Sequence, residues 1–253
     1  MLSDRSQCAL EILGEAAELA KYWFDKRDLK AELKGDGTPV TEADRSVETL
    51  MRQRLAEAFP NDGILGEEFE ETAGTTGNRW IIDPIDGTKS FIRSVPLYAT
   101  LLAYEEAGEA TFGAIALPSL SQTVYAERGA GCWSNGQPTH VSDHSDLSGA
   151  YVMATWLENW TPQHIERTRD RGMIVRTWGD AFGYTLIATG KADAIVDFDA
   201  KVYDLAPMLV IVEEAGGCFT SVDGLRDYTR GNGIASNGLI HESLIELIGQ
   251  DKT

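Results

Sequence analysis

Two carboxylates three residues apart follow an apolar stretch in the run WIIDPIDGT, residues 80–88. Pro84 fixes its backbone angle φ and has no N–H to donate, so we expect the strand to end there and the backbone to turn. Such a turn can direct Asp83, Asp86 and the carbonyl of Ile85 to one side. Mg²⁺ accepts oxygen ligands of these kinds and is usually shared with a substrate phosphate. The run therefore predicts a magnesium site, whereas an isolated Asp-x-x-Asp is more often a plain turn with a capping Asp.

The residues after Asp86 suit a bound phosphate. Gly87 permits a close approach of the backbone to a ligand. Residues 88–91 could open a helix whose free N–H groups face an anion. We therefore expect the substrate phosphate at Gly87 and Thr88, beside the metal ions.

Acids elsewhere in the first half could complete the site. Glu67 and Glu68 follow Gly66 and could supply a metal ligand and a base, although a Gly before two acids is also typical of a solvated loop. Asp44 lies three residues after Thr41, the expected N-cap of a helix. It could complete a capping box and also hold a water.

Three acids in the second half are further candidates. Asp204 precedes an apolar run and by itself would be a helix cap. Asp180 and Asp197 lie among apolar and aromatic residues, where an unpaired acid is costly. A hydrogen-bond partner, a helix cap or a cationic ligand could explain them.

The first half must position its acids with helices and a sheet. Apolar residues at helical spacing predict helices over 7–24 and 41–59, separated by a Gly/Pro-rich loop over 35–39. A buried strand and three β-like runs then predict an antiparallel sheet, which continues to a tight turn at Asn135-Gly136. These strands are expected over 79–83, 97–104, 110–117 and 122–127.

The second half alternates short apolar strands with helices, which is typical of an α/β arrangement. The strands are expected over 151–154, 173–175 and 194–196, and the helices over 161–171, 180–190 and 203–215. We therefore expect two subdomains around one cleft. An α+β subdomain over 1–140 would carry the metal site, and an α/β subdomain over 141–253 would carry the substrate-selective residues.

The composition is that of an acidic globular protein. The chain has 253 residues, 43% hydrophobic and 25% charged, with a net charge of −18. This charge argues against a nucleic-acid or anionic-membrane partner, but bound cations could still attract a small anionic substrate. Cys8, Cys132 and Cys218 suggest neither a disulfide framework nor a Cys-based metal site. With no signal-peptide core and no run of about 18–20 apolar residues, we expect a cytoplasmic protein.

Four motifs, taken in order, resemble those of the inositol monophosphatase family of metal-dependent phosphatases. They are LKGDGTPVTEAD at 33–44, GEE at 66–68, WIIDPIDGT at 80–88 and YDLAPMLVIVEEAGG at 203–217. The resemblance extends over nearly the whole chain. It implies the layered α-β-α-β-α sandwich of inositol monophosphatase and fructose-bisphosphatase, usually a homodimer with two or three Mg²⁺ per subunit.

The same resemblance implies a role for each matched residue. The implied metal ligands are Glu67, Asp83, the Ile85 carbonyl, Asp86 and Asp204. Glu67 and Thr88 would orient and activate the attacking water, with support from Asp44. Asp86, Gly87 and Thr88 would contact the substrate. Metal ions held in this way bind the phosphate, acidify a water and stabilise the leaving oxygen in a direct displacement.

The segment WGDAFGY, residues 178–184, is more similar to the histidinol-phosphatase branch than to the inositol branch. Asp180 stands where inositol enzymes tend to carry a small neutral residue, and Asp197 matches the family's substrate-contacting acid. Two carboxylates near the leaving group suit an ammonium and an imidazole better than a neutral polyol. We therefore expect hydrolysis of L-histidinol phosphate to L-histidinol, a step of histidine biosynthesis. The alternative substrates are inositol 1-phosphate or a range of sugar phosphates.

Other classes of protein fit the sequence less well. A haloacid-dehalogenase phosphatase would use a nucleophilic Asp in an Asp-x-Asp-Gly-Thr pattern, and the spacing here is one residue longer. A bisphosphate-cleaving relative would need basic residues for a second phosphate. A non-catalytic protein that binds the transcription machinery, as some family members do, would have no reason to keep all the matched residues.

Overall fold

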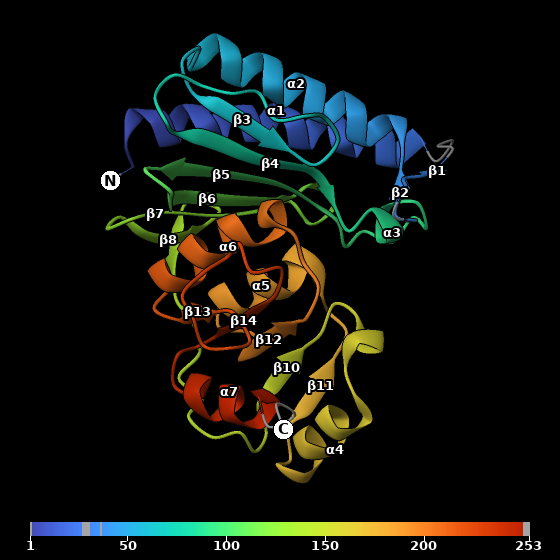
Figure 1. Ribbon diagram of the computed structural model, residues 1–253, viewed down its shortest axis with the longest axis vertical. Coiled ribbons are helices and arrows are strands. Elements are labelled where there is room, and N and C mark those ends of the chain that lie inside the picture. The colour runs from blue at the N-terminus through green and yellow to red at the C-terminus, as the bar shows by residue number, and fades with distance from the viewer. Residues whose placement is uncertain (1, 27–30, 36, 250–253) are drawn as a thin grey trace.

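A computed structural model describes residues 2–26, 31–35 and 37–249 of the chain (Figure 1). The α-helices are α1 (Asp4–Lys26), α2 (Glu42–Ala58), α3 (Thr88–Phe91), α4 (Pro162–Asp170), α5 (Asp180–Ala188), α6 (Val202–Glu214) and α7 (His241–Gly249), and the 3-10 helices are η1 (Pro118–Leu120) and η2 (Leu157–Asn159). The first strands are β1 (Glu32–Leu33), β2 (Pro39–Val40), β3 (Gly63–Gly66), β4 (Arg79–Asp86), β5 (Ala99–Glu106), β6 (Glu109–Leu117), β7 (Gln122–Glu127), β8 (Gly131–Ser134) and β9 (Gln137–Thr139). The later strands are β10 (Tyr151–Met153), β11 (Ile174–Arg176), β12 (Ala194–Asp197), β13 (Cys218–Thr220) and β14 (Gly233–Ser236).

These elements stack in five layers along the long axis of the molecule (Figure 1). Helices α1 and α2 form one outer layer, above a sheet with the order β3-β4-β5-β6-β7-β8-β9. Helices α5 and α6 lie between this sheet and a second one with the order β11-β10-β12-β14-β13. Helices α4 and α7 form the other outer layer. The predicted α-β-α-β-α sandwich is therefore confirmed.

The first sheet is antiparallel from β4 to β9, as predicted, but its edge strand β3 is parallel to β4. The strands that the sequence predicted, β4 to β7, are antiparallel as expected, whereas the parallel edge strand β3 was not predicted. Parallel neighbours need a crossover connection instead of a hairpin, and residues 67–78 form that connection. The predicted tight turn is confirmed, because Asn135 and Gly136 both have positive φ between β8 and β9.

Helix α6 lies between the two sheets and is buried on every side. All residues from 205 to 212 are buried, as expected for a helix that contacts apolar layers on opposite faces. It packs on β5 and β6 of the first sheet and on β13 of the second. Because α6 belongs to the second half in sequence and contacts the sheet of the first, the division into subdomains at residue 140 stays a prediction.

Helix α2 begins as the sequence predicts. Thr41 is its N-cap, and Asp44 completes a capping box with it. The preceding loop was predicted over 35–39, and its Asp36 lies outside the described residues.

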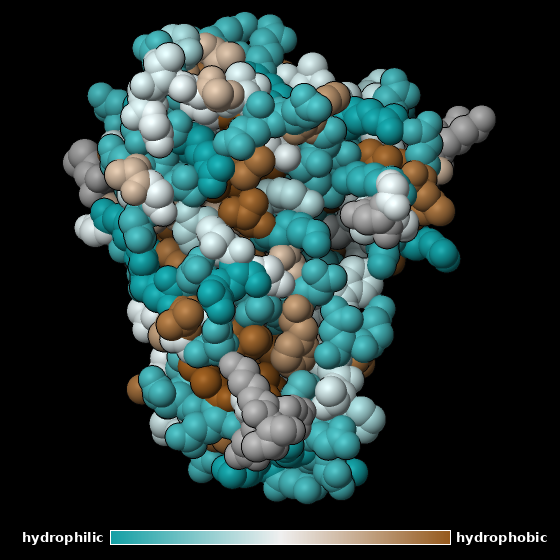
Figure 2. All heavy atoms as spheres, viewed as in Figure 1, coloured by the Kyte–Doolittle hydropathy of each residue, from teal (hydrophilic) through white to brown (hydrophobic). Residues whose placement is uncertain are grey.

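The face in Figure 2 is mainly hydrophilic, with apolar residues in small separate patches. Such scattered apolar residues are ordinary on the surface of a globular protein. In the described part of the chain, no helix combines the length and the apolar character needed to cross a membrane.

Candidate active site

The two carboxylates of β4 reach the same cleft because strand pairing is interrupted between them. Strand β4 pairs with β5 as far as Asp83 and again at Asp86, with a shift of register between. Residues three apart on a regular strand point to opposite faces, and an extra residue on one strand changes this relation. Pro84 lies in the irregular part, where its missing N–H costs no ladder bond. Its carbonyl accepts a hydrogen bond from Thr100 Oγ1 at 3.0 Å.

Three predicted metal ligands come together at this point. Ligand oxygens of Asp83, Asp86 and Asp204 all lie within 4.8 Å of one another. Burial raises the pKa of Asp83 and of Asp86 well above the usual range, and the charges of neighbouring acids raise both further. Burial also raises the pKa of Asp204 to about 7. Clustered acids of this kind are relieved by a bound cation, and hard oxygen donors fit Mg²⁺.

Each of the three carboxylates is held by a backbone N–H. Asp83 Oδ1 accepts from the N–H two residues later, at 3.0 Å. Asp86 Oδ2 accepts from Ala181 N at 2.6 Å, in the first turn of α5. Asp204 Oδ2 accepts from Lys201 N at 2.7 Å, at the start of α6. In each case these bonds use one carboxylate oxygen, and the site is assembled from one strand and two helices.

Glu67 lines the same cleft but lies outside the group of three. Its Oε1 accepts from Lys34 Nζ at 2.6 Å, and Lys34 also contacts Glu68 Oε1 at 2.7 Å. Burial raises the pKa of Glu68 to about 7. The ammonium of Lys34, whose role the sequence analysis did not foresee, therefore neutralises part of the charge at this end of the cleft.

The turn that carries Glu67 is fixed by Glu48, which the sequence analysis also missed. Glu48 is fully buried on α2 and accepts from the N–H groups of Glu68 at 2.7 Å and Phe69 at 3.3 Å. Arg52 Nε contacts the same carboxylate at 2.7 Å. A sequence signal existed, since Asp44, Glu48 and Arg52 recur every four residues and so lie on one side of the helix.

Thr88 and Asp44 lie together beside the acids. Thr88 Oγ1 is 2.9 Å from the Ile85 carbonyl and 3.3 Å from Asp44 Oδ1. The other oxygen of Asp44 accepts from the N–H and hydroxyl of Thr41, at 2.8 and 2.6 Å. Asp44 therefore completes the predicted capping box and also contacts Thr88, whereas its role in holding a water stays a prediction.

A cleft of about 420 Å³ brings these groups together with the second half. Its lining includes the predicted residues Glu67, Asp83, Ile85, Asp86, Gly87, Thr88, Asp180 and Asp204. It also includes Lys89, Arg93, Trp156 and Asp199, for which the sequence analysis proposed no role. Basic and acidic side chains thus line the same cleft.

Asp180 lies directly against the predicted phosphate turn. A Cβ atom on Gly87 would be 3.3 Å from Asp180 Oδ2, and Gly87 has a φ of +79° that favours glycine. Asp180 itself has a φ of 51°, and its N–H donates to Thr155 Oγ1 at 2.9 Å. The preceding Gly179 allows this approach, since a Cβ there would lie 2.4 Å from Thr155 Cα. Burial, and then the charge of Asp197, raises the pKa of Asp180 to about 7.

Asp197 is bound to Thr155, the residue that also accepts a hydrogen bond from Asp180 N. Its carboxylate accepts from Thr155 N at 3.1 Å and from the Tyr184 hydroxyl at 2.9 Å. It borders a small side pocket of about 50 Å³, together with Asp180 and Asp199. The predicted contact between Asp197 and substrate stays a prediction, whereas Asp199 borders both the pocket and the open cleft.

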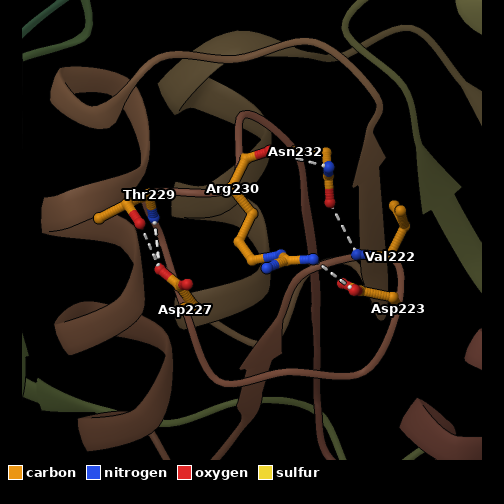
Figure 3. A pocket seen from close by; sticks show the side chains of 6 residues that line it. All are labelled: Val222, Asp223, Asp227, Thr229, Arg230 and Asn232. Carbon is orange, nitrogen blue, oxygen red and sulfur yellow. Dashed lines mark hydrogen bonds and ion pairs between the residues drawn. The ribbon is translucent and has the colours of Figure 1, made fainter.

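A second hollow, of about 430 Å³, lies among residues 222–232, in the second half of the chain (Figure 3). Its polar side chains bind one another, with Arg230 contacting Asp223 at 2.8 Å and Thr229 Oγ1 contacting Asp227 at 2.7 Å. None of the predicted site residues lines it. We therefore place the chemistry in the acidic cleft.

The sequence matches the family model described as the inositol monophosphatase family over residues 1–252. The chain belongs to the inositol monophosphatase family. It is 42% identical to the histidinol-phosphatase of Chlorobaculum parvum over 96% of both chains. It is 38% identical to the histidinol-phosphatase of Mycobacterium tuberculosis, over 97% of this chain and 98% of that protein.

A solved structure shows the same fold. The extragenic suppressor protein suhB from Bartonella henselae superimposes with a TM-score of 0.91 at 27% sequence identity, covering 97% of this chain and 98% of that one. Membership of the inositol monophosphatase family makes the chain a phosphatase and decides against the haloacid-dehalogenase alternative.

Proposed function

We propose that this member of the inositol monophosphatase family hydrolyses L-histidinol phosphate with the help of Mg²⁺. The observation that carries the proposal is the position of Asp180, whose carboxylate lies against Gly87 of the phosphate turn. A leaving group attached to a phosphate at this turn begins beside that carboxylate. An ammonium on the leaving group would form a charge-assisted hydrogen bond there, about twice as strong as a neutral one. The full-length similarity to two histidinol-phosphatases supports the same substrate.

Asp83, Asp86 and Asp204 would hold the metal ions, with Glu67 and the Ile85 carbonyl as further ligands. Bound metal would polarise the phosphoryl oxygens and acidify a water molecule. The chain's own groups then orient the reactants. Gly87 and Thr88 bind the phosphate, while Thr88 and Glu67 position the attacking water, with Asp44 holding the Thr88 hydroxyl.

We further propose two or three Mg²⁺ per subunit, a homodimer and a cytoplasmic location. The first two of these proposals rest on the family to which the chain belongs. Metal analysis of the purified protein and its mass in solution test the first two.

Thr88→Val is expected to lower kcat about a hundredfold, because valine keeps the shape of threonine but lacks the hydroxyl that orients the attacking water. Thr88→Ser retains a hydroxyl and is expected to keep most of the activity. Phosphate release at saturating Mg²⁺ measures both variants, and their melting temperatures check the fold. Equal activity of the Val and Ser variants would remove Thr88 from the reaction.

Asp180→Asn is expected to lower kcat/KM for L-histidinol phosphate about tenfold to a hundredfold, because an amide oxygen can accept from the ammonium but has no negative charge to pair with it. Asparagine tolerates the left-handed backbone at this position. Activity on inositol 1-phosphate should change by much less.

The comparison that decides is the ratio of kcat/KM for the two esters in the original protein and in the variant. A wild-type preference for inositol 1-phosphate would refute the proposed substrate. An equal loss on both esters would refute the role of Asp180 while leaving the substrate in place.

A further inference from the structure

In the cleft, the ammonium of Lys89 lies over the ring of Trp156. Lys89 Nζ lies 3.7 Å from the centroid of the Trp156 ring. The same ammonium lowers the pKa of Asp180, although burial outweighs it. A positive charge here therefore gains from both an aromatic face and a carboxylate.

The backbone just before Trp156 is held by two hydrogen bonds. The residue before it, Thr155, donates its N–H to Asp197 at 3.1 Å and accepts at Oγ1 from Asp180 N at 2.9 Å. These two bonds connect the start of the Trp156 segment to β12 and to α5. The backbone that carries Trp156 is thereby anchored beside Asp180.

Lys89, by contrast, is free to leave. Its side chain is exposed, whereas Trp156 is half-buried. Trp156 also borders the small side pocket that Asp180 and Asp199 share with the cleft. Because Trp156 lines both hollows together with Asp180, a leaving group that starts at the phosphate turn can reach the indole.

We propose that the indole face of Trp156 holds the imidazole ring of the leaving group, and that Lys89 gives up this position when substrate binds. The proposal rests on the proposed function and adds to it a residue that selects the ring. Asp180 recognises the ammonium, and Trp156 recognises the flat, partly cationic imidazole, by stacking or by a cation–π contact. A neutral polyol offers neither group.

Three phosphate esters separate the two contributions. L-histidinol phosphate has both the ammonium and the ring, the phosphate ester of 2-amino-1-propanol has only the ammonium, and glycerol 2-phosphate has neither. Trp156→Leu is expected to lower kcat/KM for L-histidinol phosphate about tenfold more than for the two ring-free esters. Trp156→Phe keeps an aromatic face and is expected to recover most of that difference.

Equal losses on all three esters, or no loss on L-histidinol phosphate, would overturn the role of Trp156. Failure of the proposed function would give a different result in the same assay: the unmutated enzyme would show no preference for L-histidinol phosphate over glycerol 2-phosphate.

A binding measurement tests the displacement of Lys89. Lys89→Gln removes the competing ammonium, so L-histidinol itself, which has no phosphate, should bind about two- to fivefold more tightly by calorimetry. Weaker binding of L-histidinol to this variant would overturn the displacement.

Discussion

Asp83→Asn is expected to lower turnover at saturating Mg²⁺ about a thousandfold and, at the same time, to stabilise the metal-free protein. The loss of activity follows because metal ions contribute several kcal/mol to such reactions, and about 4 kcal/mol corresponds to a factor of 1,000. The gain in stability follows because Asp83 is buried among acids that raise its pKa. An amide has no charge to bury, and its oxygen can still accept the backbone hydrogen bond that Asp83 accepts now.

We expect the gain to be about 1–3 kcal/mol at pH 8, or roughly 3–10 °C in melting temperature for a chain of this size. Melting curves in the presence of a chelator measure it. Asp193→Asn is the matched control, since Asp193 is also buried but outside the cleft, where it accepts hydrogen bonds from Ser142 and Tyr151. The control variant should lose stability and keep its activity. If Asp83→Asn also destabilises the metal-free protein, the cluster is a structural network and no metal site.

The metal-free protein is expected to lose stability as the pH rises from about 5 to 8. Burial raises the pKa of Asp180 and of Asp204 to about 7, against the usual value of 3.8. Between these two values the folded state binds more protons than the unfolded state, so the free energy of unfolding falls with pH. The loss begins above the unfolded pKa and is complete above the folded one. His241 opposes this trend, because burial lowers its pKa, but it is one group against several.

The expected size is several kcal/mol, or on the order of 10 °C in melting temperature between pH 5 and pH 8. Mg²⁺ should restore the loss, and its stabilising effect should be larger at pH 8, because protons compete with the metal at low pH. Melting curves at both pH values, each with chelator and with Mg²⁺, give the four melting temperatures to be compared. A metal-free protein that is more stable at pH 8 than at pH 5 would contradict the raised pKa values.

Local sequence patterns predicted the first half of the fold well. Strands expected over 97–104, 110–117 and 122–127 appear as β5, β6 and β7, within two residues at each end. Their signal is local, because they follow one another in space as they do in sequence. Strands β13 and β14 were not predicted, although they are similar in length to β10, β11 and β12, since their pairing joins segments that are distant in sequence.

In the candidate site too, local sequence signals predicted correctly and contacts between distant segments were missed. The run over 80–88 identified the acids and the turn, since the signal lay within nine residues. It did not reveal that Ala181 on α5 holds Asp86, or that Glu48 on α2 holds the turn of Glu67. Such contacts depend on how layers meet, and periodicity within one segment carries no information about them.

The first turn of α5 gives this architecture a simple route for change during evolution. In the proposed function Asp180 offers its side chain to the leaving group, while the next residue, Ala181, offers only its backbone N–H to Asp86. A substitution at position 180 can therefore alter the preferred alcohol without removing a donor from the hydrolytic centre. With Asp180 in its proposed role, a change at this one position would shift the substrate preference and leave the metal ligands intact, so a duplicated gene for such an enzyme could acquire a new substrate while remaining a working phosphatase.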